Sequence, residues 1–255
     1  MFTLFADLWL LLLGFVAGIL GSMIGLGGGI IVVPVLTFLG FSPQLAASNS
    51  LFAAFSNAIA STISYTRQKR IEYLLGLKLG LLSIPGTILG AFISADITPS
   101  VFKTLFGIVL IVSSVYIFSK RKIESKSYNL SKQIMVLVVA ASFFAGIISS
   151  LFGIGGGIVF VPLMVIAIGL SMKLAAPTSQ FVLLFASASG MIAHTFLGHP
   201  DFYQALLLAG GAFVGGLVGS RLSLEIEEKK LRTIVSSVIV IAAIKLFIDS
   251  LKGPF

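Results

Sequence analysis

The chain has 255 residues, of which 57% are hydrophobic and only 10% are charged, and its mean hydropathy is +1.11. Apolar segments of about 20 residues follow one another, which excludes a soluble domain and indicates an all-α polytopic membrane protein rather than a β-barrel. The net charge of +8 does not indicate nucleic-acid binding, because the basic residues lie at segment ends. The absence of cysteine excludes disulfides and thiolate metal sites, and no motif calls for a cofactor.

Ten apolar segments are predicted, five in each half of the chain. In the first half they are 2–24, 30–41, 45–65, 73–95 and 100–118, and in the second half 133–152, 158–170, 174–197, 202–220 and 230–251. The first segment lacks a preceding basic region and is therefore predicted to be a membrane segment rather than a cleaved signal. The predicted organisation is a first membrane repeat over residues 1–118, a basic linker over 119–132, and a second membrane repeat over 133–255.

A glycine-rich string occurs at the same place in both halves. The copies occupy residues 18–34 and 146–162, and 10 of their 17 aligned positions are identical, including a Gly-x-Gly-Gly-Gly core and the closing proline. After a one-residue gap the similarity continues, with residues 47–50 matching 176–179. The two halves are therefore interpreted as an internal duplication.

The segments that follow the strings, 30–41 and 158–170, hold only 12 and 13 residues. They are too short to cross a hydrocarbon core of about 30 Å. Each is predicted to be a half-length helix that packs back across the glycine turn, so that each repeat opens with a glycine-broken helical hairpin. Because five segments is an odd number, the two repeats are predicted to have inverted orientations.

The basic residues predict the orientation. If the linker is cytoplasmic, the turns at 66–72, 171–173 and 221–232 lie on the same side as the linker. The linker and these turns together hold 13 of the 17 Lys and Arg. The opposite turns, which hold none, are 42–45, 96–99 and 198–202. Loops rich in Lys and Arg remain on the cytoplasmic side of a membrane. We therefore expect a multi-pass protein of the inner (plasma) membrane with both termini outside. Parallel repeats, with each broken pair counted as one crossing, would place basic turns outside.

The glycine triplets predict an anion site. A helix begins directly after each triplet, and its first N–H groups have no intrahelical partner and lie at the positive end of the helix dipole. No charged residue lies in the middle of an apolar segment, so the site must be built from backbone and uncharged polar groups, and a small anion fits it better than a cation. The candidate substrate-binding residues are Gly27, Gly28, Gly29, Ser48, Asn49, Ser50, Gly155, Gly156, Gly157, Thr178, Ser179 and Gln180.

Each of these residues also has a purely structural interpretation. Serine and threonine in membrane helices often bond to the preceding turn or a neighbouring helix, and small residues at four-residue spacing allow close helix packing. The latter is the expected role of the pairs Gly14–Gly18, Gly86–Gly90, Gly211–Gly215 and Gly215–Gly219. If transport is coupled to protons, His194 is the best candidate for carrying them.

The duplicated Gly-x-Gly-Gly-Gly-x-x-x-Val-Pro strings, each followed by an Ala-x-[Asn/Thr]-Ser start of the next long helix, resemble the sulfite exporter TauE/SafE family. The resemblance covers nearly the whole chain and implies an inner-membrane carrier for sulfite or organosulfur anions such as sulfoacetate. Asn49 in the first half corresponds to Thr178 in the second, and Pro177 has no equivalent. The two half-sites are therefore expected to be similar but not equal.

The leading hypothesis is a secondary transporter of a small sulfur-containing oxyanion or organosulfonate. The alternatives are an anion channel, a transporter of another small organic anion, or a non-transporting membrane assembly partner. An enzyme is not expected, because the two histidines belong to no hydrolase or metalloprotease motif. The expected partners are the small anion, the lipid bilayer and a coupling ion, H⁺ or Na⁺, if there is one. Nucleic acid is not among them, and the oligomeric state stays open.

Overall fold

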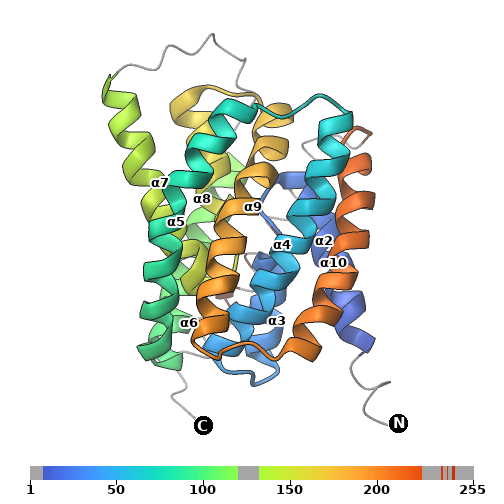
Figure 1. Cartoon of the computed structure of the whole chain (residues 1–255), viewed down its shortest axis with the longest axis vertical. Coiled ribbons are helices and arrows are strands. Elements are labelled where there is room, and N and C mark those ends of the chain that lie inside the picture. Colours follow the sequence, from blue (N-terminus) through green and yellow to red (C-terminus); the bar gives the residue numbers. More distant parts are fainter. Residues whose placement is uncertain (1–7, 120–131, 226–236, 238–239, 241–242, 245–255) are drawn as a thin grey trace.

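The computed structural model describes residues 8–119, 132–225, 237, 240 and 243–244, and the regular structure of these residues is entirely helical (Figure 1). In chain order the elements are α2 (Leu8–Ile24), α3 (Gly29–Phe38), α4 (Pro43–Arg67), α5 (Tyr73–Asp96), α6 (Pro99–Ser119), α7 (Lys132–Phe152), α8 (Gly157–Pro162), the π-helix η1 (Leu163–Ile168), α9 (Met172–Phe196) and α10 (Phe202–Leu222). The linker residues 120–131, both termini and most of the predicted segment 230–251 lie outside the described residues.

The helices follow the predicted apolar segments closely, so an all-helical membrane protein is confirmed. Within the described part of the chain, α5, α9 and α10 are each long and apolar enough to span a membrane. The helix α4 is equally long but richer in serine, alanine and asparagine, and 15 of its residues are buried, from Pro43 to Tyr65. Its polar composition therefore reflects a position inside the bundle rather than against lipid.

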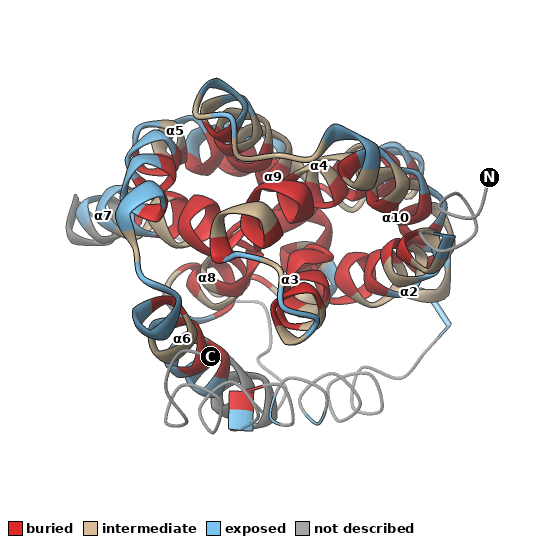
Figure 2. Cartoon of the chain, turned by 90° about the horizontal axis from the view of Figure 1, so that it is seen from below, coloured by how far each residue is buried: buried red, intermediate tan, exposed pale blue. Residues whose placement is uncertain are grey.

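The helices form a central group with a pair on either side. Figure 2 shows α3, α4, α8 and α9 between the pair α2–α10 and the pair α5–α7, and these central helices carry much of the buried surface. Each side pair joins one helix from each half of the chain, because α2 packs on α10 and α7 packs on α5. The two halves are thus interleaved rather than placed side by side.

Glycines make the two side pairs possible. A methyl group on Gly211 would overlap the carbonyl oxygen of Leu11, and one on Gly18 would lie 2.6 Å from the carbonyl oxygen of Ala212. In the other pair, a methyl group on Gly90 would overlap the backbone of Ile147. The predicted packing role of the spaced glycines is confirmed, since only a missing side chain lets these backbones approach.

Both glycine strings are buried inside the bundle. Residues 21–30 and 151–158 are buried without exception. Gly25 has a φ of +80° and Gly153 a φ of +68°, so both adopt the left-handed conformation that favours glycine. The chain turns there, and the half-length helices α3 and α8 begin in the interior at Gly29 and Gly157.

The π-helix η1 explains the one-residue gap between the halves. Equivalent residues are separated by 128 positions up to Pro34 and Pro162, and by 129 positions from Ala47 and Ala176 onwards. In the first half α3 continues through Pro34 as an α-helix, whereas in the second half the chain widens into η1 directly after Pro162. A π-turn holds one extra residue without changing the ends of the segment, so η1 absorbs the insertion.

Hydrogen bonds at the helix ends group the turns on two faces. On one face, Arg70 Nε donates to the carbonyl oxygen of Lys173 at 3.0 Å and its Nη1 donates to Ser223 Oγ at 3.1 Å. On the other face, Gln44 Nε2 donates to the carbonyl oxygen of Ile97 at 3.3 Å, and the 198–202 turn reaches Asn49. Figure 1 shows the α4–α5 turn and the α9–α10 turn at opposite ends, which is the grouping predicted from the basic residues.

Candidate functional site

The two glycine strings touch each other at the centre of the bundle. A methyl group on Gly29 would overlap the carbonyl oxygen of Gly153 and lie 2.6 Å from the Cα atom of Ile154. The reciprocal contact has Gly157 against the carbonyl oxygen of Gly25, with Leu26 Cα at 2.7 Å. The triplets, which are far apart in the sequence, are therefore brought together, and the first residue of each half-length helix lies against the opposite string.

Two serines fasten this junction. Ser50 Oγ on α4 donates a hydrogen bond of 2.7 Å to the carbonyl oxygen of Gly153, and Ser179 Oγ on α9 donates one of 2.6 Å to that of Gly25. Both serines are fully buried. They occupy equivalent positions in the two halves, so each half holds the glycine turn of the other half in the same way.

Asn49 and Thr178, two of the predicted substrate-binding residues, each accept a hydrogen bond from the chain just before another helix. Asn49 Oδ1 accepts from the backbone N–H of Asp201 at 3.0 Å, and Thr178 Oγ1 accepts from the backbone N–H of Glu72 at 3.0 Å. Asp201 and Glu72 are the N-cap residues of α10 and α5. These side chains satisfy donors just before two helices begin, while Ser48 Oγ, also a candidate, donates to the carbonyl oxygen of Leu45 in its own helix.

Only one of the two polar atoms of the Gln180 side chain has a hydrogen-bond partner among the described residues. Its Nε2 donates to the carbonyl oxygen of Gly21 at 2.9 Å, which ties α9 to the start of the first glycine turn. Its Oε1 is buried and has no hydrogen-bond partner. A buried acceptor without a donor is costly, and the residue at the equivalent position of the first half is the apolar Leu51. The Oε1 atom of Gln180 is therefore available to a donor that the described residues do not supply.

Unpaired N–H groups lie at both half-length helices. No acceptor among the described residues bonds to the amides of Gly28, Gly29 and Ile30. The same holds, in that part of the chain, for Gly156, Gly157 and Ile158, where α8 continues directly into η1. Free amides at a buried helix start carry partial positive charge and suit a negative ligand.

One apolar side chain, Leu183 of α9, lies against both triplets. A methyl group on Gly27 would be 2.7 Å from its Cδ2 atom, and one on Gly155 would be 3.0 Å from the same atom. Leu183 is fully buried. The residue at the equivalent position of the first half is Ala54, whose Cβ lies 3.4 Å from a methyl group on Gly155. The site is thus closed by a large side chain from one half and a small one from the other.

Leu183 and Ala54 were missed by the sequence-based prediction, although a signal was present. Each lies four residues after a predicted serine, Ser179 and Ser50, and so faces the same side of its helix one turn later. Because they are apolar residues in apolar helices, only this register relative to the serines distinguishes them from ordinary packing residues.

The buried ring of His194 also contacts a glycine-string segment. His194 Nε2 lies 3.0 Å from the carbonyl oxygen of Ser150, three residues before Gly153, and its Nδ1 lies 2.8 Å from Nδ1 of His199. The equivalent residue of the first half, Tyr65, donates from its hydroxyl to the carbonyl oxygen of Ser22 at 2.8 Å. Both halves therefore tether the helix before the glycine turn by an aromatic polar side chain.

Arg70 connects several helix ends at the opposite end of the bundle from His194. Besides Lys173 and Ser223, it contacts Gln68, whose Oε1 accepts from Nη1 at 3.0 Å, and its guanidinium lies 5.4 Å from the centre of the Tyr65 ring. Burial lowers the pKa of Arg70 from its ordinary value, but an arginine stays charged in proteins. One cation therefore joins the ends of α4, α9 and α10.

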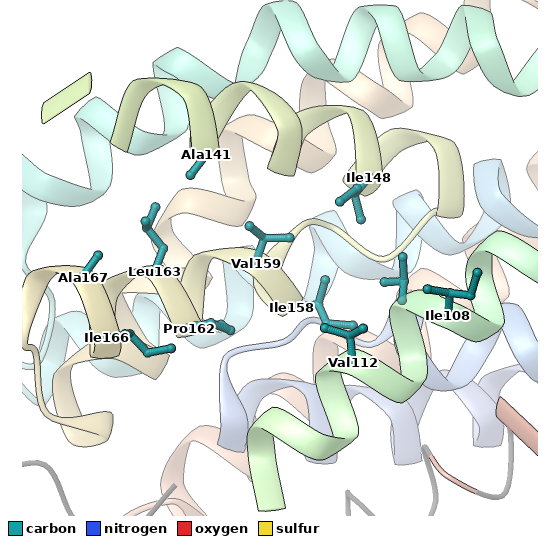
Figure 3. Close-up of a pocket in the computed structure, with 11 residues that line it drawn as sticks. Ile108, Val112, Ala141, Ile148, Ile158, Val159, Pro162, Leu163, Ile166 and Ala167 are labelled. Atoms are coloured by element: carbon teal, nitrogen blue, oxygen red, sulfur yellow. The ribbon is translucent and has the colours of Figure 1, made fainter. Parts of the chain in front are cut away.

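An apolar cavity of about 470 Å³ lies beside the site, between α6, α7, α8 and η1 (Figure 3). Ile108 and Val112 of α6, Ile148 of α7, and Ile158 and Ile166 of α8 and η1 line it. Val112 is 63% exposed and Ile166 is 54% exposed, so the cavity opens to the outer surface of the bundle. Its lining side chains offer hydrocarbon contacts and no charged or polar group, so a charged ligand is disfavoured within it.

The fold and the site define a polytopic helical membrane protein with two buried, mutually packed glycine turns, an arrangement suited to a membrane transporter. The chain belongs to the sulfite exporter TauE/SafE family, which it matches over residues 10–246. The resemblance carried by the glycine strings is thereby confirmed, and the protein is a member of a membrane transporter family.

Relatives across bacteria and archaea match almost end to end. The chain is 32% identical to the probable membrane transporter protein YunE of Bacillus subtilis, with 95% of this chain and 97% of YunE covered. It is 30% identical to the probable membrane transporter protein MJ0441 of Methanocaldococcus jannaschii, covering 90% and 91% of the two chains. It is 23% identical to the probable membrane transporter protein YfcA of Escherichia coli K12, covering 92% and 87%. No solved structure matches the chain.

Proposed function

We propose that the protein is a secondary transporter of a small sulfur-containing oxyanion or organosulfonate, of the sulfite or sulfoacetate kind. The anion binds near the membrane midplane at the two glycine turns. The observation that carries this proposal is the burial of both triplets against each other, with the amides of Gly28–Ile30 and Gly156–Ile158 left unpaired. Family membership supports transport, and the unpaired amides support a negative ligand.

The charge distribution supports an anion over a cation. Residues 8–66, 133–172 and 174–200 contain no Lys, Arg, Asp or Glu. A cation in the membrane interior normally needs carboxylate ligands, and these segments supply none. Backbone amides and hydroxyl or amide side chains remain, and in the proposed site Ser50, Ser179 and Gln180 lie closest to the turns. The proposed substrate-binding set also includes Ser48, Asn49 and Thr178. Their hydrogen bonds to the backbone hold the surrounding helices in place.

The proposed architecture is a pair of inverted repeats, residues 1–118 and 133–255, joined by a cytoplasmic linker at 119–132. The support is the reciprocity of contacts: Ser50 with Gly153 against Ser179 with Gly25, and α2 with α10 against α7 with α5. Alternating access then opens the central site first to one side of the membrane and then to the other. In this proposal the protein is in the inner membrane and both termini are outside.

The first experiment measures ligand binding and flux. Purified protein is heated with sulfite, sulfate, thiosulfate, sulfoacetate, phosphate or chloride, and the same anions are tested for counterflow in proteoliposomes. A ligand that binds only the folded state raises the melting temperature, so a sulfur anion is expected to stabilise selectively and to exchange. Saturable counterflow distinguishes a carrier from an anion channel, and selective stabilisation by a non-sulfur organic anion would redirect the substrate assignment.

A matched pair of variants locates the binding site. Gln180→Leu introduces the residue that the first half has at this position, so the fold is expected to tolerate it while the anion loses affinity. Ser56→Ala removes a hydrogen bond of 2.8 Å from α4 to the carbonyl oxygen of Ala209 and should leave anion affinity unchanged. Indifference of the wild type to every anion, in both assays, would favour a non-transporting assembly partner and overturn the proposal.

A further inference from the structure

The two histidines of the chain form a pair whose hydrogens can be assigned. His194 is fully buried on α9, and His199 lies partly exposed in the turn before α10. A carbonyl oxygen only accepts, so His194 Nε2, 3.0 Å from Ser150, must carry a hydrogen. Neutral His194 then accepts at Nδ1, and His199 donates from its own Nδ1 across 2.8 Å. The Nε2 atom of His199 is left as a free acceptor.

This arrangement can take up one proton and move its charge inward. A proton from water binds Nε2 of His199, and the shared hydrogen then shifts from Nδ1 of His199 to Nδ1 of His194. His199 returns to a neutral ring, and His194 becomes an imidazolium that still donates to Ser150. A second proton would place two N–H groups of two cations against each other across 2.8 Å, so the pair holds one extra proton and titrates as a unit.

Within the described part of the chain, no charged side chain bonds to either imidazole. Of the elements packed against α9, only α7 brings a hydrogen-bonding group to the His194 ring, through Ser150. The charged side chains at this end of the described helices are Asp96 on α5, Lys103 on α6 and Asp201 before α10. The carboxylate of Asp201 accepts from the amide of Gln204 rather than from either imidazole. Burial also lowers the pKa of His199 below its ordinary value, so the extra proton needs a stabilising partner.

The other half cannot perform this task. Tyr65 occupies the position of His194 and makes the same kind of bond, to the carbonyl oxygen of Ser22 at 2.8 Å. A phenol has an ordinary pKa near 10 and takes up no proton near neutral pH. Of these two equivalent positions, only the one at the end of the bundle that carries the 198–202 turn can therefore take up a proton near neutral pH.

We propose that His199 and His194 form a proton-binding site that couples proton uptake at the 198–202 face to anion transport. The inference rests on the proposed function of the glycine turns as an anion site. A positive charge on His194 lies at the carbonyl oxygen of Ser150, three residues before Gly153 in the sequence. A bound anion at that glycine turn is the partner proposed for this charge. Each ligand then raises the affinity for the other by the same factor, as linkage requires.

The first test observes the pair directly and needs no substrate. Because the chain has two histidines, protein labelled with ¹⁵N-histidine gives spectra from these rings alone. The expected result is a scalar coupling between the two Nδ1 atoms at neutral pH and uptake of a single proton by the pair on acidification. Two rings that titrate independently, with no coupling between their Nδ1 atoms, would overturn the proposal whatever the transport assays show.

The second test measures coupling in proteoliposomes. Accumulation of the anion driven by a pH gradient is compared with counterflow in the absence of a gradient. His199→Gln and His194→Gln are expected to lose gradient-driven accumulation, and their counterflow becomes independent of pH. Tyr65→Phe, the matched change in the other half, keeps gradient-driven accumulation. Histidine variants that accumulate as the wild type does would refute coupling, whereas absent counterflow in the wild type would refute the proposed function itself.

Discussion

Ser50 on α4 donates its hydroxyl hydrogen to the carbonyl oxygen of Gly153, 103 residues further along the chain, at 2.7 Å. Ser179 on α9 makes the equivalent bond to Gly25 at 2.6 Å. Each of the two glycine turns is therefore held by a helix of the opposite half. The geometry of one half-site depends on a residue of the other half, which links the two turns mechanically.

Replacing these serines should loosen the site and the fold together. Ser50→Ala or Ser179→Ala leaves a buried carbonyl oxygen without its donor, at a cost of about 1–3 kcal/mol. We expect a lower melting temperature in detergent and weaker anion binding in the same variant. Ser56→Ala, which removes a bond of the same type from α4, should lower stability without weakening anion binding. Equal losses of anion affinity in all three variants would contradict the special position of Ser50 and Ser179.

Alanine substitution at two adjacent glycines of α10 is expected to affect stability to very different extents. A methyl group on Gly211 overlaps the carbonyl oxygen of Leu11, whereas one on Gly210 lies 3.5 Å from Leu11 Cδ2 in ordinary contact. Gly211→Ala should destabilise the protein by about 1–3 kcal/mol through forced separation of α2 and α10. Gly210→Ala should change stability by no more than about 0.5 kcal/mol. Thermal unfolding of the two purified variants in one detergent decides the comparison.

Leu183 is predicted to set the size of the anion. Leu183→Ala introduces the small residue that the other half has at the equivalent position, Ala54. The substitution opens space beside Gly27 and Gly155. The cavity should cost about 2–5 kcal/mol of stability, while the affinity ratio shifts toward bulkier organosulfonates over sulfite. Leu51→Ala, a buried leucine one turn away from Ala54, is the control for stability alone. An unchanged affinity ratio for Leu183→Ala would exclude this residue from the substrate site.

The orientation can be tested cleanly because the chain contains no cysteine. Thr66 and Thr98 are both exposed and lie at opposite ends of the bundle. With the basic turns inside, a membrane-impermeant maleimide added to intact cells should label Thr98→Cys and spare Thr66→Cys until the membrane is permeabilised. The reverse pattern would show that the protein has the opposite orientation.

Much of the helical framework is predictable from the sequence, and the reason is physical. A membrane helix must be apolar over its length, so the boundaries of α5 and α7 fall within a residue of the apolar segments 73–95 and 133–152. Glycines at four-residue spacing predict close backbone contact, which Gly86 and Gly90 make with α7. Such features depend on local composition and spacing.

The partners of polar side chains depend on tertiary structure and were not predictable in this way. Asn49 and Thr178 sit beside the junction serines in the sequence, yet they bond to the N-cap residues Asp201 and Glu72 of helices in the opposite half. The pairing of His194 with His199 depends on how the chain turns after α9. The π-helix can be located from the sequence, since the one-residue gap in the repeat marks the place where it occurs.

The exchange of helices between the halves constrains how the protein is made. Gly14 and Gly18 leave the ribosome early, but Leu208 and Ala212, which their backbones contact, are synthesised near the end of the described chain. Until then α2 carries a bare glycine face and the first glycine turn lacks Ser179. The first half therefore enters the bilayer before the helices that pack against it have been synthesised. Truncation after the first half should yield a substrate for membrane quality control, and co-expression of the missing half should rescue it.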